Sequence, residues 1–256
     1  MASPIRQIRD SIQRVGTART LLKIIGRPYE LLRRKIAVSK ILSLPTAEQR
    51  FTWIYQNDYW QSKESVSGTG STLRYTENLR KELPVIFRKF GIRRVFDAPC
   101  GDFNWMSHLL PEVDVSYVGG DIVQPLILSL EQRFRTDRIA FVHIDLICGK
   151  FPPADLMICR DCLFHLSYAD TRSVLDNFVA SGIPYLLTTS HKNDGKVVNR
   201  DIQTGSFRVM DLFASPYNFP QETLARVDDW VAPDPEREMC LWSREQVAAA
   251  LARFGR

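Results

Sequence analysis

Four acidic side chains stand at the ends of predicted strands, the place where open α/β sheets bind ligands. Asp97 ends the first strand, and Asp121 and Asp145 follow at intervals of 24 residues, each after another apolar run. Asp161 follows the fourth run, directly after Arg160. Because the carboxyl ends of parallel strands meet at one edge of a sheet, we expect these carboxylates to line one crevice. Taken singly, each is also explained as a turn or helix-capping residue.

The loop after the first strand has one glycine between two acidic residues. It reads Asp97-Ala98-Pro99-Cys100-Gly101-Asp102 and lacks the Gly-x-Gly-x-x-Gly pattern that lets a backbone approach a pyrophosphate. These carboxylates would repel a pyrophosphate, but they suit a nucleoside that carries a cationic centre and an amino group. S-adenosylmethionine (SAM) has a sulfonium and an α-ammonium group. Asp121, at the end of the second strand, is placed to accept hydrogen bonds from a ribose.

Alternating strand and helix patterns form the scaffold for these residues. Strands are predicted at residues 93–98, 115–121, 139–145, 154–160 and 184–190, with helices at 103–110, 123–135 and 169–181. This alternation is typical of parallel βαβ units with right-handed crossovers. Two further helices are predicted upstream, one beginning after Thr46 and one ending at Gly91. A Pro-rich turn within residues 222–242 indicates a terminal antiparallel hairpin.

Residues 93–190 resemble the class I SAM-dependent methyltransferases, and the likeness covers about residues 58–245. It rests on "DAPCGDFNWM", "GGDIV", "DLMICRDCLFHLSY" and "LLTTSH", which resemble a bacterial branch associated with sugar or cell-surface polysaccharide pathways. Pro99 and Phe103 replace the first and third glycines of the family motif. The resemblance implies an α/β fold with a Rossmann-like, seven-stranded, mostly parallel sheet and an antiparallel terminal hairpin. It also implies methyl transfer from SAM, leaving S-adenosylhomocysteine (SAH), to a small molecule, with a sugar or glycan hydroxyl preferred.

The same resemblance implies roles for cofactor-binding residues. Asp97 and Gly101 would shape the loop at the methionine end, Asp121 would bind the ribose, and Asp145 would lie near the adenine amine. The upstream segment "SVSGTGST" would hold the methionine carboxylate. The residues expected to line the cofactor site are Ser67, Gly68, Thr72, Asp97, Ala98, Pro99, Cys100, Gly101, Asp121, Ile122, Asp145, Leu146 and Arg160.

The segment after the fourth strand contains the candidate catalytic residues. Asp161 and His165 are four residues apart, so on a helical turn they share a face. His165 with a carboxylate partner is a candidate general base for deprotonating a hydroxyl. A packed histidine that only orients this segment is the competing interpretation. His191, after the fifth strand, is the second candidate base.

The polar stretch that follows the fifth strand is expected to contact the acceptor. In the resembling branch "NRDIQTGSFR" sits over the active site, and the candidate acceptor-binding residues are Asn199, Asp201 and Arg208. Metal binding by His191, Asp201 and Asp161 is conceivable chemically. No tight spacing of ligands favours it, so no metal is predicted.

Positive charge is concentrated near the N-terminus. Of a net charge of +5, residues 1–40 carry +8, from ten Lys/Arg and two Asp/Glu, so the remaining 216 residues carry about −3. Apolar residues at helical spacing over residues 1–42 predict two or three short amphipathic helices. We assign residues 1–57 to a basic helical arm and residues 58–256 to the methyltransferase domain. The arm either packs on the body or meets an anionic partner, such as a lipid surface.

The composition indicates a cellular compartment but is compatible with several functions. The chain has no apolar run of 18 residues, and its five cysteines are irregularly spaced, so a cytoplasmic protein with reduced thiols and no transmembrane helix is predicted. Nucleic acid is disfavoured as a partner by the acidic body and by the lack of an Asn/Asp-Pro-Pro-Tyr/Phe motif. A non-catalytic SAM-fold module and an N-methyltransferase of a small metabolite remain alternatives. A nicotinamide oxidoreductase is disfavoured by the missing glycines. The sequence does not indicate the oligomeric state.

Overall fold

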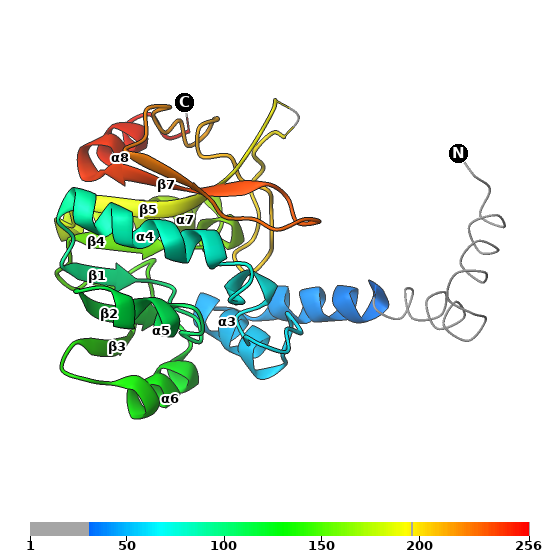
Figure 1. Ribbon diagram of the computed structural model, residues 1–256. Coiled ribbons are helices and arrows are strands. Elements are labelled where there is room, and N and C mark those ends of the chain that lie inside the picture. Colours follow the sequence, from blue (N-terminus) through cyan, green and yellow to red (C-terminus); the bar gives the residue numbers. More distant parts are fainter. Residues whose placement is uncertain (1–30, 196, 256) are drawn as a thin grey trace, which may run out of the picture. The chain divides into compact units, whose positions relative to one another are not determined.

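The computed structural model describes residues 31–195 and 197–255, and the chain divides into two compact units, Met1–Ser43 and Leu44–Arg256 (Figure 1). In the first unit, residues 31–43 form a helix, as the apolar spacing predicts for the end of the basic arm. The arm helices predicted nearer the N-terminus lie outside the described residues. The assignment of residues 1–57 and 58–256 to separate domains stays a prediction. All of the sheet and the helices that cover it belong to the second unit.

In the described part of the chain, seven strands form one mixed sheet in the order β3-β2-β1-β4-β5-β7-β6. The first five strands pair in parallel, while β7 is antiparallel to both β5 and β6. The predicted fold class is therefore confirmed. The strands are β1 (Arg94–Asp97), β2 (Ser116–Asp121), β3 (Ile139–His143), β4 (Leu156–Cys159), β5 (Tyr185–His191), β6 (Ala225–Asp228) and β7 (Arg237–Ser243).

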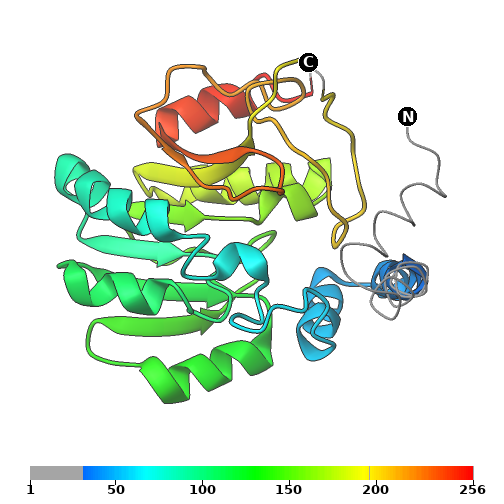
Figure 2. The ribbon, with the colours of Figure 1, turned by 45° about the vertical axis from the view of Figure 1, so that its right-hand side comes forward.

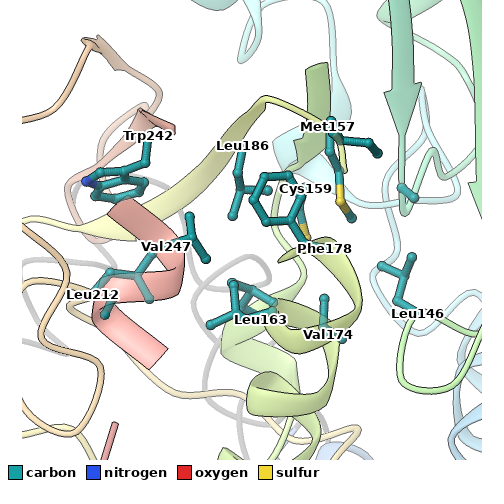
Figure 3. Close-up of a cluster of buried hydrophobic side chains, with 14 of the residues drawn as sticks. Leu146, Met157, Cys159, Leu163, Val174, Phe178, Leu186, Leu212, Trp242 and Val247 are labelled. Carbon is teal, nitrogen blue, oxygen red and sulfur yellow. The ribbon is translucent and has the colours of Figure 1, made fainter. Parts of the chain in front are cut away.

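Helices cover both faces of this sheet and bury two apolar clusters (Figure 2). One cluster joins α4 (Glu77–Phe90), α5 (Met106–Leu109) and α6 (Gln124–Phe134) to the sheet. The other joins α7 (Tyr168–Ser181) and α8 (Arg244–Leu251), with Phe178 and Trp242 at its centre (Figure 3). Burying a side chain such as Phe178 contributes about 1.5–3 kcal/mol, so the two clusters hold the strand ends in place.

The helix boundaries follow local sequence signals. The N-cap of α3 (Ala47–Gln56) is Thr46, whose hydroxyl accepts a bond from the Gln49 amide, as predicted. Helix α4 ends at Gly91, whose positive φ of 65° favours glycine. Helix α8 was not predicted, although Ser243 and Gln246 form a capping box at its start. Its short apolar pattern was absorbed into the prediction of the hairpin.

Two irregular segments lie at the carboxyl end of the parallel strands. The first runs from the end of α3 through the 3-10 helix η1 (Thr69–Ser71) to α4, and the second connects β5 to β6 (Figures 1 and 2). The η3 turn (Leu163–His165) follows β4 at the same end. The predicted site residues therefore come from strand ends and from the loops beside them.

Candidate functional site

The loop that follows β1 joins two buried carboxylates. Asp97 is 2% exposed, and its Oδ2 accepts a bond of 2.8 Å from the Tyr117 hydroxyl. Burial raises the pKa of Asp97 to about 7, against the opposing effect of that bond and of Arg160. Gly101 has a φ of +54°, and its amide donates to Asp121 Oδ2 at 3.1 Å. The single glycine thus turns the chain back onto the neighbouring acid.

Asp121 keeps hydrogen-bonding capacity that the protein does not use. Its carboxylate is 7% exposed, and the amides of Gly101 and Val123 donate to its two oxygens at 3.1 and 3.0 Å. Each carboxylate oxygen can accept more than one bond, so Asp121 can accept further bonds of the kind that a ribose diol offers. Burial raises the pKa of Asp121, and hydrogen bonds from the amides of Val123, Gly101 and Ile122 oppose this effect.

The third strand end contributes groups that are less constrained. Asp145 is half-buried and accepts a bond of 2.9 Å from the Ile147 amide, which is the capping role that its position also suggested. Leu146 is buried, and the Ile122 carbonyl accepts a bond from His143 Nε2 at 3.0 Å. The residues predicted for the nucleoside end of the ligand therefore lie at the carboxyl ends of the adjacent strands β2 and β3 or directly after them.

The upstream loop is fastened to the β1 end by Asp102. Asp102 accepts bonds from the Ser65 hydroxyl and the Val66 amide at 3.0 and 2.9 Å, and its own amide donates to Ser67 Oγ at 2.9 Å. The segment "SVSGTGST" therefore lies beside the β1 loop, and its role in holding the cofactor stays a prediction. Thr72 Oγ1 instead donates to the Thr69 carbonyl within η1.

Gly68 and Gly70 let this loop approach the rest of the site closely. A Cβ atom at Gly68 would lie 3.2 Å from Trp60 Cβ, and one at Gly70 would lie 2.9 Å from Asp161 Oδ2. Gly68 also has a φ of +99°, which disfavours other residues. The loop therefore contacts both an aromatic residue and the acid that follows β4.

A balanced set of buried charges lies where β4 meets the terminal hairpin. Arg160 donates to both oxygens of Asp229, at 2.8 and 3.0 Å, and to the Gly70 carbonyl at 2.8 Å. Arg237 donates to Asp161 Oδ2 at 2.7 Å. Asp229 and Arg237 were missed by the sequence analysis. The only signal for them was a pair of charges beside otherwise apolar hairpin residues.

Asp161 does not form the predicted hydrogen bond with His165. Burial opposes ionisation of Asp161, but Arg160 and Arg237 outweigh it and hold the pKa of this carboxyl below its usual range. Asp161 also has a φ of +52°, and its amide donates to Thr189 Oγ1 at 2.9 Å. The segment is not helical at this position, so a spacing of four residues does not bring the two side chains together.

The two histidines occupy different environments. His165 Nδ1 lies 2.7 Å from the Ser206 carbonyl, which can only accept a hydrogen bond, so Nδ1 carries the proton. Burial lowers the pKa of His165, so the ring is neutral at pH 7 and its Nε2 has a free lone pair. His191 is 2% exposed, and burial lowers its pKa to about 4. His165 is more exposed to solvent than His191, so it is the better candidate for the base.

The predicted acceptor-binding residues mainly hold their own loop in place. Asp201 Oδ1 accepts a bond from the Tyr168 amide at 2.7 Å, and Asn199 bonds both backbone groups of Asp211. Arg208 is 7% exposed, and one of its nitrogens donates to the Tyr217 hydroxyl at 2.6 Å. The segment therefore lies against η3 and the start of α7. Asn199 and Arg208 are buried and Asp201 is exposed, and contact of these three residues with an acceptor stays a prediction.

Metal ligation finds no support in the surroundings of the three residues considered for it. Asp161 pairs with Arg237, Asp201 accepts backbone amides, and His191 contacts Met210. Across residues 31–195 and 197–255, no group of three His, Cys, Asp or Glu side chains is arranged to hold a metal ion. Within the same residues, no helix is long and apolar enough to span a membrane.

Asp97→Asn is expected to stabilise the ligand-free protein more at pH 7.5 than at pH 4. The pKa of Asp97 in the folded state, about 7, lies above its ordinary value of 3.8. The wild-type carboxyl therefore makes the free energy of unfolding fall as the pH rises from about 4 to about 7. Asparagine cannot ionise but still accepts the Tyr117 bond. Since the pKa is raised from 3.8 to about 7, we expect the stability difference to grow by about 3–4 kcal/mol across this range. Urea denaturation at both pH values measures it, and a pH-independent difference would contradict the raised pKa.

The comparisons with known proteins identify the fold. No family model and no curated protein matches the chain. Among solved structures, a SAM-dependent methyltransferase from Leishmania major matches with a TM-score of 0.57 and 14% identity, over 78% of this chain and 87% of that one. The N-methyltransferase NodS from Bradyrhizobium japonicum, in complex with SAH, matches with a TM-score of 0.52 and 14% identity, over 74% and 97%.

A third solved structure agrees with these two. It is 1,6-didemethyltoxoflavin-N1-methyltransferase from Burkholderia thailandensis with bound 1,6-didemethyltoxoflavin and SAH, with a TM-score of 0.52 and 17% identity, over 78% and 92%. At these identities the comparison establishes a shared fold, that of the SAM-dependent methyltransferases, which the sequence resemblance implied. The finer expectation of a branch that acts on sugars or polysaccharides stays a prediction.

Proposed function

We propose that the protein is a SAM-dependent methyltransferase that acts on a hydroxyl group of a small molecule. The observation that carries the proposal is the pair of buried acids, Asp97 and Asp121, around Gly101 at the adjacent ends of β1 and β2. In this fold, that is the crevice in which a nucleoside binds. Asp97 and Asp102 lie close to Gly101 in the sequence, and Asp121 accepts a bond from its amide. These three carboxylates suit a cationic ligand and disfavour a pyrophosphate.

The side chains of the site fit the parts of SAM. Asp121 has free lone pairs for the ribose hydroxyls, and Asp145 with Ile122 and Leu146 would border the adenine. Asp97 and Gly101 would face the methionine portion, with Ser67 and Gly68 beside its carboxylate. A buried Asp97 with a pKa of about 7 ionises more readily when a cation binds beside it, which favours a sulfonium ligand.

The residues after β4 and β5 would act on the acceptor. SAM supplies the methyl group, whose bond to sulfur breaks as the acceptor oxygen forms its new bond to carbon. His165 Nε2 takes the hydroxyl proton, since Nδ1 is already protonated and donates to Ser206. Asp161 stays ionised between Arg160 and Arg237 and stabilises the imidazolium that His165 becomes. Alignment of the reacting atoms supplies much of the remaining rate.

Methylation of an amine is a second candidate function. Two of the solved structures with this fold are N-methyltransferases. An amine acceptor that is already neutral needs no general base, so the behaviour of His165 variants separates the two reactions. The preference for a sugar hydroxyl rests on the sequence resemblance alone.

Isothermal titration of the full chain with SAM and with NAD tests the proposed function. We expect one SAM to bind per chain and no binding of NAD, because the β1 loop lacks the glycines for a pyrophosphate. Tight binding of NAD, or the lack of any SAM binding, would contradict the proposal. SAM binding without turnover of any acceptor in a broad panel would favour a non-catalytic module.

Removal of residues 1–43, the larger part of the basic arm, is expected to leave SAM binding unchanged. A chain that begins at Leu44 keeps the whole second compact unit, including every proposed cofactor-binding residue. If the arm contacts the acceptor or an anionic lipid surface, its removal changes the acceptor KM or vesicle binding and not the Kd for SAM. Calorimetry on the truncated chain, with circular dichroism to confirm folding, makes the measurement. A folded truncated chain that no longer binds SAM would contradict this prediction.

A further inference from the structure

His165, the proposed base, lies between two aromatic side chains from different loops. Its ring centroid is 6.4 Å from that of Trp60 and 5.8 Å from that of Phe207. Trp60 belongs to the segment before η1, and Phe207 belongs to the segment between β5 and β6. Phe164 lies behind them, 5.5 Å from Phe207. We call Trp60, Phe164 and Phe207 the aromatic wall.

The wall adjoins the proposed cofactor loop. Trp60 packs against Gly68, where a Cβ atom would lie only 3.2 Å away. A continuous series of contacts therefore runs from the loop beside Ser67 through Trp60 and His165 to Phe207. An acceptor whose hydroxyl reaches His165 Nε2 must lie against these rings.

Phe207 is exposed although its loop is held rigidly. Its exposed fraction is 53%, while its neighbours on both sides bond to the protein: the Ser206 carbonyl to His165 and the Arg208 amide to the Phe164 carbonyl. Thr204 accepts a bond from the Ser167 amide and donates to Asp170. The loop thus presents a large apolar ring beside the proposed base instead of burying it, so a ligand that reaches His165 can pack against this ring.

Most polar side chains of the same loop are engaged within the protein. Asn199, Asp201 and Thr204 direct their hydrogen bonds at groups of residues 163–217, and Arg208 donates to the Tyr217 hydroxyl through one nitrogen, while its Nε and Nη1 have no partner among the described residues. An aromatic ring packs favourably against other aromatic rings in offset-stacked or edge-to-face arrangements. What the loop offers beside His165 is mainly an aromatic surface.

We propose that the acceptor is an aromatic compound with a ring hydroxyl, and that Phe207 and Trp60 determine this specificity by stacking on its ring. The inference rests on the proposed function, since it concerns the same methyl transfer. It replaces the sugar hydroxyl, which the sequence resemblance favours, by a phenolic hydroxyl. A phenol is also more acidic than a sugar hydroxyl, which suits a base whose pKa burial has lowered.

The test measures binding of two probes to the full chain saturated with SAH. The probes are 1-naphthol and methyl β-D-glucopyranoside, and saturation-transfer NMR gives their Kd values. We expect 1-naphthol to bind at least tenfold more tightly than the glucopyranoside. Phe207→Ala is expected to weaken 1-naphthol binding about tenfold, and Phe207→Tyr to restore it, since stacking needs only the ring. SAH affinity should be unchanged in both variants.

Val198→Ala is the matched control. Val198 is 75% exposed on the same segment and makes no ring contact with His165, so its removal should leave 1-naphthol binding unchanged. The proposal is overturned if 1-naphthol does not bind, if the glucopyranoside binds as tightly, or if Phe207→Ala has no effect. Failure of SAH itself to bind would instead contradict the proposed function, so the two failures are distinguishable.

Discussion

Replacing His165 by alanine is expected to lower kcat by about 10²–10⁴-fold while SAM affinity stays nearly unchanged. The reason is that Nε2 of His165 is the free nitrogen of a neutral ring, because Nδ1 donates to the Ser206 carbonyl at 2.7 Å. No other accessible base of this kind lies beside Phe207, since His191 is 2% exposed. Steady-state kinetics with the acceptor that sustains the highest turnover in a panel of ring hydroxyls, and calorimetry with SAM, measure both quantities.

The pH dependence of kcat gives a second readout of the same residue. Protonation of His165 removes the lone pair, so activity should fall on the acid side, below pH 6.5, because burial lowers the pKa of His165 from its ordinary value. The acid limb should disappear in His165→Ala. His108→Ala, on the exposed side of α5, is the control and should leave the profile unchanged. Full activity in His165→Ala would show that an amine acceptor or another base is used, and Asp161 would be the next candidate.

Asp121→Ala is expected to weaken SAM binding by about 1.5–3 kcal/mol, or roughly 10- to 150-fold in Kd. The substitution removes the free lone pairs that the ribose hydroxyls would use. It also leaves the amides of Gly101 and Val123 without their acceptor, so the β1 loop loses an anchor. Asp121→Asn keeps one carbonyl oxygen and should cause a smaller loss. Calorimetry with SAM compares the three proteins.

The control for Asp121→Ala is the same substitution at a carboxylate in the connection between β2 and β3. Asp137 is exposed in the turn between α6 and β3, so Asp137→Ala should leave the Kd for SAM unchanged. Thermal denaturation must show that Asp121→Ala is folded. An unchanged Kd in a folded Asp121→Ala protein would remove the ribose assignment and with it the proposed orientation of the cofactor.

The parallel strands and the acids at their ends could be predicted because both follow from local patterns, whereas the order of the strands in the sheet was not predicted. Apolar runs of four to six residues ended at Asp97, Asp121 and Asp145, and parallel pairing brings such ends to one edge. Strand boundaries were right to within two or three residues. Helix α8 was missed because its apolar pattern is only eight residues long and directly continues β7.

The direction of the side chains around the acceptor site could not be predicted. Asp161 was expected to face His165 on a helical turn, but its positive φ turns it toward Arg237, which comes from a strand 76 residues later. Asn199, Asp201 and Arg208 were expected to face the acceptor because this segment sits over the active site in the branch that the sequence resembles. They instead bond the start of α7 and the segment after β5, partners that only the folded chain identifies.

The aromatic wall left no pattern in the sequence for the same reason. Trp60 and Phe207 are 147 positions apart, and no regular spacing relates them. Only the two sets of loop contacts, through Gly68 and through Ser206, bring them to the same histidine. Long-range contacts between loops are the part of a site that local sequence patterns specify least.

A crystal structure of the full chain with SAH tests the central claim most directly. The account predicts SAH across the ends of β1, β2 and β3, with its ribose hydroxyls within hydrogen-bond distance of Asp121 and its sulfur on the side of His165. SAH bound elsewhere on the chain, or in this crevice with its ribose away from Asp121, would contradict it.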